Sequence, residues 1–335
     1  MSQATDLLPP YPVSSQPLSV GQVLDRIFKL FRGNFRLFLK IAAVPTGANM
    51  GLLVLIGAVL FLSGMLSNPP HSPDPKSMVW VVVSAFVGGL VLMLVYSIFE
   101  AASSYASLQA NLGVTVSFRQ AYEIAWNRGG RFVWLMILRS LWVGLPMLIC
   151  YAIIAGVGVL VFTAGGKSHP GGDSNPAVFF LIFPLFFLMY FGSMVYAVIM
   201  GIRLALAPPA CIAENLAASS ALKRSLQLSR NAKGRIFVVL LVVYAASYLA
   251  FMIFEVLCFV LMTAGVLVAT ALHIQFVPPW SFIGIALLGI FGACILFLWM
   301  AGISASYSIA FAVLYHDQRL RTEGAATALT AGEPT

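Results

Sequence analysis

Charged side chains are scarce in this sequence of 335 residues, of which 9% are Asp, Glu, Lys or Arg and 60% are hydrophobic. So few charges cannot cover the surface of a soluble globular protein of this length, and the composition excludes that class. The apolar runs also lack the alternation of polar and apolar residues that marks the strands of a membrane barrel. The sequence therefore predicts an all-α fold, a polytopic bundle of membrane-spanning helices.

Sequence signals of catalysis are also missing. There is no glycine-rich phosphate loop, no Ser-His-Asp order and no pair of carboxylates of the kind that acid-base catalysis uses. The cysteines lie in or beside apolar runs, which indicates small core residues without a disulfide framework or metal spacing; they are Cys150, Cys211, Cys258 and Cys294. We expect no catalytic residue and no cofactor.

A metal site is not expected either. Three histidines, His71, His169 and His273, fall in three predicted outer loops. Only Asp74 and Asp173 accompany them, so a fortuitous scatter is favoured over a metal centre.

Six apolar runs exceed the roughly 20 residues that cross a hydrocarbon core. They cover residues 41–66, 78–107, 134–163, 177–207, 236–272 and 281–314. Pro45, Pro146 and Pro184 lie inside these runs, where each can bend a helix or simply serve packing. The first 18 residues are polar and proline-rich, so no signal peptide is expected. We predict disordered tails at residues 1–18 and 325–335, with a membrane domain at residues 19–324.

The distribution of positive charge predicts the orientation in the membrane. Of the 19 Lys and Arg residues, only Lys76 and Lys167 lie in the three short Pro- and Gly-rich connections. The other 17 lie near the two termini, in the longer connections 108–133 and 208–235, or at the ends of the adjacent runs. By the positive-inside rule both termini and both long connections are cytoplasmic, as in a multi-pass protein of the bacterial inner membrane.

Three basic segments start at Ser19, Ser117 and Ser220, at offsets of 98 and 103 residues. Each precedes a pair of apolar runs, so we predict three helix-hairpin repeats near residues 19–116, 117–219 and 220–324. Ser19 with Gln22, and Ser117 with Gln120, match a capping box. The third segment has Lys223 in place of the glutamine, which predicts a weaker cap.

These segments also have the pattern of amphipathic helices at a cytoplasmic membrane surface. In the first, Val20, Leu24, Ile27, Phe31, Phe35 and Phe38 share one stripe. Basic residues flank such stripes and predict contact with anionic lipid head groups or with a protein partner on the cytoplasmic face. The candidates are Arg26, Lys29, Arg32, Arg36, Arg128, Arg131, Lys223, Arg224 and Arg230. Their position beside apolar runs argues against nucleic acid as a partner.

Three stretches carry a resemblance to a known family: LSVGQVLDRIFKLFRGNF from Leu18, AENLAASSALKRSLQLSRNAKGRIF from Ala213 and LYHDQRLRTEG from Leu314. In their order and spacing the chain resembles the membrane domain of the bacterial glycerophosphoryl diester phosphodiesterase family. The resemblance implies a helical domain of about six spans, sometimes fused to a soluble phosphodiesterase barrel. Such a barrel takes about 250 residues, and we expect none here, so no catalytic residue is carried over.

Glu100, Arg139, Arg203 and Glu255 lie in or near the apolar runs, where a charge is costly and invites a functional hypothesis. Glu100 and Arg203 each precede a repeat serine by 17 residues, so we predict that they face the bundle interior and can pair. The alternative is that both side chains reach the cytoplasmic interface. Glu255 is either a protonation or ligand site or a neutral, hydrogen-bonded acid.

After the last run, Asp317 and Glu323 could pair with Lys223, Arg224 or Arg230 and hold the third repeat. The sequence favours a non-enzymatic membrane protein with a lipid-interacting, accessory or scaffolding role. The alternatives are a transporter with a cavity lined by Glu100, Arg203 and Glu255, and an enzyme that acts on lipid head groups.

Overall fold

The computed structural model describes residues 17–62, 75–165, 176–271 and 280–331. The helices in these ranges are α1 (Val20–Leu62), α2 (Pro75–Asn111), α3 (Phe118–Asn127), α4 (Gly129–Gly165), α5 (Pro176–Leu204), α6 (Ala207–Ala213), α7 (Ala218–Leu228), α8 (Lys233–Ala271) and α9 (Trp280–Ala331). No strand occurs in the described ranges, and the all-α prediction is confirmed.

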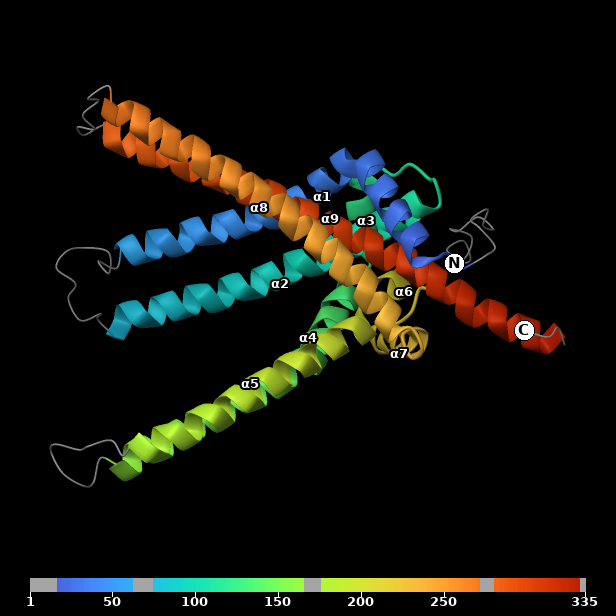
Figure 1. Cartoon of the computed structure of the whole chain (residues 1–335), viewed down its shortest axis with the longest axis horizontal. Helices are drawn as coiled ribbons and strands as arrows, with labels where there is room; N and C mark the ends of the chain where they lie inside the picture. Colours follow the sequence, from blue (N-terminus) through green and yellow to red (C-terminus); the bar gives the residue numbers. More distant parts are fainter. Residues whose placement is uncertain (1–16, 63–74, 166–175, 272–279, 332–335) are drawn as a thin grey trace.

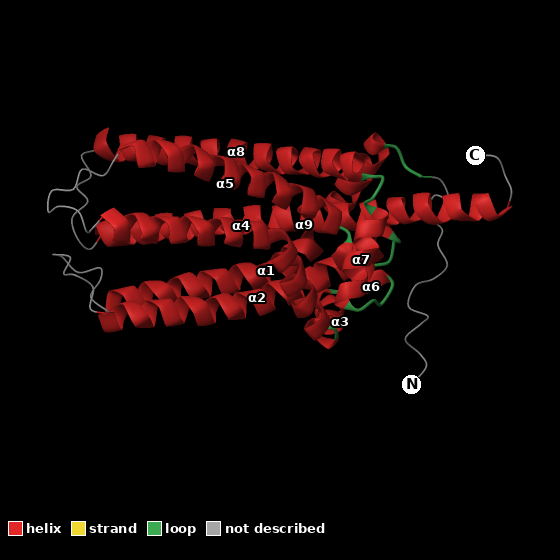
Figure 2. Cartoon of the chain, turned by 90° about the horizontal axis from the view of Figure 1, so that it is seen from below, coloured by secondary structure: helices red, strands yellow, loops and turns green. Residues whose placement is uncertain are grey.

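The six long helices pack as hairpins, α1 with α2, α4 with α5 and α8 with α9 (Figure 1). The hairpins point the same way, and the short helices α3, α6 and α7 gather at their other end (Figure 2). Among the described residues, five stretches are long and apolar enough to cross a membrane: Val20–Leu60, Met78–Asn111, Gly129–Val157, Phe186–Ala213 and Lys233–Gly265. This arrangement is typical of a multi-pass membrane protein.

The buried core lies where the hairpins meet the short helices. On α2, Ala101, Ala102 and Ala106 are inaccessible, and small residues of this kind let neighbouring helices approach closely in membrane proteins. Nearer the far ends, large apolar side chains such as Leu53 and Trp80 are 63% and 68% exposed. Such an apolar outer surface is what a hydrocarbon environment covers.

Pro45 lies inside α1, and its consequence for the backbone is visible. A proline has no N–H, so the carbonyl four residues earlier, that of Ile41, loses its helical donor. The hydroxyl of Tyr122 on α3 donates to this carbonyl at 2.8 Å. Burial raises the pKa of Tyr122, which keeps the hydroxyl protonated as a donor. A side chain outside the helix thus satisfies the group that Pro45 frees.

Two of the three predicted helix caps are confirmed. The Ser19 N–H donates to Gln22 Oε1 at 2.7 Å and the Gln22 N–H donates to Ser19 Oγ at 3.3 Å. Ser117 and Gln120 form the same reciprocal pair at the start of α3. Both are capping boxes.

The third cap was predicted at the wrong residue. The N-cap of α7 is Ala217, which has no side chain that can cap, and Ser220 lies inside the helix. Helix α7 already begins at Ala218, two residues before Ser220. Neither Ala218 nor Ser219 is a residue that breaks a helix. The first segment also differs from the other two, since it runs without a break into its apolar stretch as α1, whereas α3 ends before α4 and α7 ends before α8.

Candidate functional site

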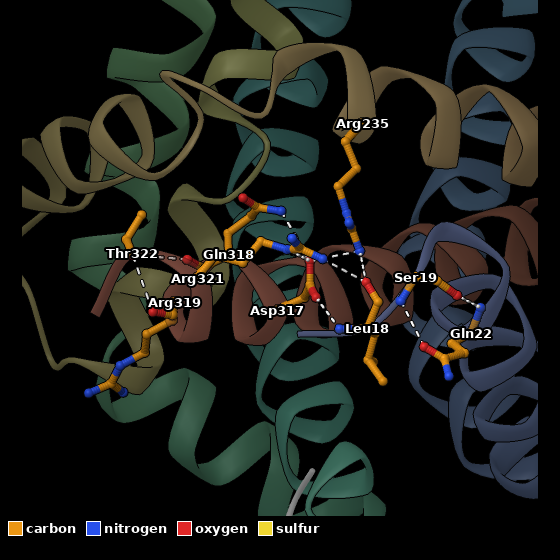
Figure 3. A network of polar contacts seen from close by, with 9 residues as sticks. All are labelled: Leu18, Ser19, Gln22, Arg235, Asp317, Gln318, Arg319, Arg321 and Thr322. Atoms are coloured by element: carbon orange, nitrogen blue, oxygen red, sulfur yellow. Dashed lines mark hydrogen bonds and ion pairs between the residues drawn. The ribbon is translucent and has the colours of Figure 1, made fainter. Parts of the chain in front are cut away.

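The carboxylate of Asp317 on α9 lies at the centre of a polar cluster that joins the two ends of the described chain (Figure 3). Its side chain is fully buried and forms ion pairs with Arg235 at 3.1 Å and Arg321 at 3.2 Å. The Leu18 N–H donates to Asp317 Oδ1 at 2.9 Å. Arg321 also donates to the Leu18 carbonyl at 2.7 Å, and Arg235 donates to the same carbonyl. We call these four residues the Asp317 cluster.

The Asp317 cluster joins elements that are far apart in the sequence. Leu18 precedes α1, Arg235 lies in the first turn of α8, and Asp317 and Arg321 lie one turn apart on α9. A buried carboxylate is stable only when its charge and lone pairs are satisfied, and two guanidinium groups with one amide N–H provide this here. The cluster therefore fixes the position of the N-terminal segment against the last hairpin.

A second cluster joins α6, α7 and α9 through Arg224. Its guanidinium forms ion pairs with Glu214 at 2.9 Å and with Glu323 at 2.5 Å, and the Tyr315 hydroxyl donates to Glu214 at 2.7 Å. The predicted contact between Glu323 and the third basic segment is thus confirmed at Arg224. Asp317 does not pair with Lys223, Arg224 or Arg230 as predicted, because its Oδ2 is paired with Arg235 and Arg321 and its Oδ1 accepts from the Leu18 N–H.

The protonation of this Arg224 cluster follows from the contacts. Burial on its own would lower the pKa of Arg224, but the bonds and charges of Glu214 and Glu323 outweigh it and raise the pKa. Burial would likewise raise the pKa of Glu323, and the bonds from Arg319 and Arg224 outweigh it and lower the pKa. Both shifts favour the charged forms of Arg224 and Glu323 at neutral pH.

Two of the arginines that the sequence placed on a lipid-facing surface bind asparagines instead. Arg26 on α1 donates from Nε to Asn111 Oδ1 at 2.7 Å and from Nη2 to the Asn111 carbonyl at 2.8 Å. Arg131 on α4 donates to Asn215 Oδ1 at 2.9 Å and to the Asn215 carbonyl at 3.2 Å. The recurrence of Asn-Leu at the inner ends of two predicted repeats is the sequence signal that could have indicated these sites.

The remaining candidates divide into inward and outward groups. Arg128 donates to the Ile212 carbonyl at 3.4 Å, and Arg224 lies in the cluster just described. Lys29, Arg32, Arg36, Lys223 and Arg230 are exposed. Lys29 forms a helical ion pair with Asp25 at 2.8 Å that leaves its side chain 75% exposed. We call Lys29, Arg32 and Arg36 the basic face of α1.

Aromatic side chains lie beside the basic face. Phe28 is 62% exposed and Phe35 is also exposed, although Phe35 was predicted to share the stripe that includes the buried Ile27. As far as Ile41, the buried positions of α1 are Val23, Ile27, Phe38 and Ile41. Phe28 and Phe35 thus lie at the edge of the packed face, next to positive charge, as in helices at a membrane interface.

The intramembrane charges do not pair as predicted. Glu100 on α2 forms an ion pair with Arg139 on α4 at 2.6 Å, and both side chains are mostly buried. Within the described residues no ion pair joins Glu100 to Arg203, so the proposed pairing of these two is wrong. The physical reason is that α2 packs against α4, which brings Arg139 rather than the end of α5 to the carboxylate.

Arg203 and Glu255 lie apart from this pair. Arg203 ends in a guanidinium whose Nε is buried without a hydrogen-bond partner in the described part of the chain, while its carbonyl accepts from Ser225 at 2.7 Å and Ser229 at 3.2 Å. Glu255 is exposed on α8 among exposed apolar neighbours such as Ile253 and Val256. The three predicted residues therefore do not form one polar site.

An apolar cavity of about 610 Å³ lies between α1, α8 and α9. α1 provides Leu24, Ile27, Phe28, Phe31 and Phe35; α8 provides Val242, Val243, Ala246, Ser247, Ala250, Phe251 and Phe254; α9 provides Ile295, Trp299, Gly302, Ile303 and Ser306. The polar groups among the lining side chains are the hydroxyls of Ser247 and Ser306 and the indole N–H of Trp299. Sequence reasoning missed this cavity because it depends on how α1 crosses the last hairpin.

Within the described ranges no group of three or more His, Cys, Asp or Glu side chains is placed to hold a metal ion. The predicted outer-loop residues His71, His169 and His273 lie outside those ranges. No protein-family model, curated protein or solved structure matches the chain. Its function must therefore be argued from the clusters, the basic face and the apolar cavity.

Proposed function

We propose that this chain is a non-enzymatic, multi-pass protein of the bacterial cytoplasmic membrane that binds anionic lipid on its cytoplasmic side. In this proposal all six long helices cross the membrane as three hairpin repeats, with both termini in the cytoplasm. The resemblance to the membrane domain of the glycerophosphoryl diester phosphodiesterase family belongs to the same proposal. It gives the expected architecture and no reaction.

The observation that carries the proposal is the exposed surface of α1, where Phe28 and Phe35 lie beside the basic face. Exposed aromatic rings can enter the head-group region, and neighbouring cations attract anionic head groups with about 1 kcal/mol for each Lys or Arg. The N-terminal part of α1, which carries the basic face, lies beside α3 at the end of the molecule that holds the short helices (Figure 1). The positive-inside rule places this end in the cytoplasm, where the leaflet is anionic.

The burial pattern of the three basic segments supports the predicted repeat. When the third copy is aligned on its observed cap, Ala217, the buried residues Val23, Ala121 and Ala221 coincide, each four residues after its cap. One turn later Ile27, Ala125 and Ser225 are buried as well. The hydroxyl of Ser225 donates a hydrogen bond to the Arg203 carbonyl. The copies thus share a packed face even where their sequences have diverged.

The contacts of three arginines also support the predicted repeat. Arg26 binds Asn111 across 85 residues, and Arg131 binds Asn215 across 84 residues. In the third unit Arg235 forms its ion pair with Asp317, a separation of 82 residues by their numbers. In each predicted repeat an arginine in its first part thus holds a polar side chain in its last part: Asn111 ends α2, Asn215 follows α6 and Asp317 lies on α9.

A transporter is less well supported by the geometry. Glu100 pairs with Arg139, and Glu255 is exposed on α8. Glu100, Glu255 and Arg203 are not among the residues that line the apolar cavity. The residues on which a transport pathway was expected to depend are therefore dispersed.

The proposal is tested with the variant Lys29→Gln/Arg32→Gln/Arg36→Gln in vesicles that contain phosphatidylglycerol and phosphatidylcholine. Spin-labelled lipids of both kinds report their relative association with the protein. We expect the preference for phosphatidylglycerol to fall by about fivefold for each charge removed at low salt, and the wild-type preference to weaken at high salt. Arg119→Gln, an exposed arginine on α3, is the control for a lost charge elsewhere. An unchanged preference in the triple variant contradicts the proposal.

A further inference from the structure

The apolar cavity extends from the cytoplasmic end of the molecule into the membrane-spanning part of the last hairpin. Its α1 residues lie between Leu24 and Phe35, before the first predicted span. On α8 the lining runs from Val242 to Phe254, a rise of about 18 Å along the helix axis. On α9 the lining lies between Ile295 and Ser306, also within a predicted span. The cavity thus connects the head-group level with the hydrocarbon level.

The cavity can be entered from outside. Phe28 at its α1 wall is 62% exposed and Val242 on α8 is 41% exposed. At Gly302 on α9 a Cβ atom would meet nothing within 4 Å, so the wall there is open space rather than packed side chains. A volume of about 610 Å³ is within the range of ligand sites that bury a large part of a small molecule.

Water is a poor occupant for this space. A water molecule inside a protein needs two to four polar partners, and the lining offers few beyond Ser247, Ser306 and the indole N–H of Trp299. The Ser306 hydroxyl is already bonded to the Gly302 carbonyl at 2.8 Å. An empty cavity would deprive the lining side chains of van der Waals contacts. A flexible apolar chain is the occupant that fits this chemistry.

Positive charge lies next to the α1 wall of the cavity. Arg32 follows the lining residue Phe31 in the sequence, and Arg36 follows the lining residue Phe35. Both arginines are exposed. A molecule whose chain enters between α1, α8 and α9 can therefore place a negative group beside these guanidinium groups, which form strong hydrogen bonds with phosphate oxygens.

We propose that the apolar cavity holds one acyl chain of an anionic phospholipid from the surrounding bilayer, with its phosphate beside the basic face of α1. The inference rests on the proposed lipid-binding function and adds a defined site to it. The acyl chain gains little hydrophobic free energy when it moves from the bilayer into the cavity, because lipid tails are as apolar as the lining. The head-group contacts therefore decide which lipid occupies the site, and the shape of the cavity decides where it lies.

The test uses the full chain in vesicles of equal phosphatidylglycerol and phosphatidylcholine. The probe is phosphatidylglycerol with a photoreactive diazirine in one acyl chain, and labelled peptides are identified by mass spectrometry. We expect labelling concentrated on the lining segments of α1, α8 and α9, above the level on the exposed surface of α4. Unlabelled phosphatidylglycerol should compete more effectively than unlabelled phosphatidylcholine.

Two variants that fill the cavity, Gly302→Trp and Ala250→Trp, should reduce labelling of these segments to the level on α4. Gly156→Trp is the matched control, because Gly156 is exposed on α4 and also has open space around its Cβ position. Labelling that is uniform over all exposed helices, or that persists in both filled variants, overturns the site.

The outcome also separates this site from the proposed function. If filling the cavity abolishes local labelling while the overall preference for phosphatidylglycerol remains, the site is supported. If both filled variants still label while Lys29→Gln/Arg32→Gln/Arg36→Gln loses the preference, the site is wrong and the function of the basic face stands. If the triple variant keeps the preference, the proposed function is wrong, and so is the head-group part of this inference.

Discussion

At the scale of single residues, Asp317 shows how much of the fold depends on one buried charge. Its carboxylate lies between Arg235 and Arg321 and accepts from the Leu18 N–H. Breaking such a buried pair leaves cations uncompensated, which is strongly destabilising, whereas an exposed pair contributes little. The contact of Leu18 with Asp317 spans 299 residues, so its loss also frees the N-terminal segment.

We expect Asp317→Asn to lower the free energy of unfolding by about 3 kcal/mol, because the amide cannot neutralise two guanidinium groups. The measurement is the midpoint of thermal denaturation of the purified protein in detergent. Asp25→Asn is the matched control, since the Asp25 side chain is 61% exposed in its pair with Lys29 and should change stability by less than about 0.5 kcal/mol. Equal losses in the two variants would contradict a special role for Asp317.

Tyr122 provides a second test at this scale, through the carbonyl that Pro45 leaves without a donor. Tyr122→Phe removes one hydroxyl and should cost about 1 to 2 kcal/mol, the penalty for a buried acceptor left unsatisfied. Tyr151→Phe on the exposed surface of α4 is the control, and it should have little effect on the denaturation midpoint.

A double variant separates this contact from general packing. Pro45→Ala restores an N–H that can bond to the Ile41 carbonyl within α1, so the loss caused by Tyr122→Phe should shrink in its presence. If the loss is the same with and without Pro45, the hydroxyl does not act through that carbonyl.

These residues also show the limit of prediction from sequence. The pattern of α1 identified a basic amphipathic helix, but it could not tell that Arg26 turns inward to Asn111 while Arg32 stays exposed. Both arginines satisfy the same helical periodicity. The choice depends on a partner 85 residues away, and such tertiary contacts leave no local signal.

At the scale of elements, the long apolar helices were predictable because a run of about 20 apolar residues has few alternatives to a helix. Their ends were less predictable, since α1 continues from the basic segment into its apolar part without a break. The caps at Ser19 and Ser117 were found from a local motif. The cap of α7 was missed because Ala217 has no capping side chain to recognise.

This difference in caps gives a prediction. Ser117→Ala removes the acceptor for the Gln120 N–H and should cost about 1 kcal/mol. Ser220→Ala lies inside α7 and should be neutral or slightly stabilising, because alanine has the higher helix propensity. The denaturation midpoints of the two variants in detergent provide the measurement. A loss at Ser220 as large as that at Ser117 would show that α7 begins at Ser220 in solution.

At the scale of the whole molecule, the hairpins converge on the end that holds the short helices (Figure 1). The Asp317 cluster and the Arg224 cluster join elements at this end. Most of the arginines that the positive-inside rule counts are thus also structural. Arg26 binds Asn111 at the end of α2, Arg131 binds Asn215 after α6, and Arg235 pairs with Asp317 on α9. The basic residues whose asymmetry predicts the orientation of the chain therefore also hold together the end at which they gather.

The orientation itself is testable by the accessibility of single cysteines in a variant without native cysteines. Ser219→Cys lies on the exposed surface of α7, at the end with the clusters, and should react with a membrane-impermeant maleimide only after the membrane is permeabilised. Ser72→Cys and Ser168→Cys, in predicted outer connections, should react in intact spheroplasts, because these connections contain few of the chain's basic residues.

The opposite pattern of labelling would place the basic face and the mouth of the apolar cavity on the outer side of the membrane. It would then remove the anionic cytoplasmic leaflet as the source of the lipid and with it the reason for the charge beside Phe31 and Phe35. The orientation is in this sense the premise of the lipid proposal, and the cysteine experiment tests it without any assumption about the ligand.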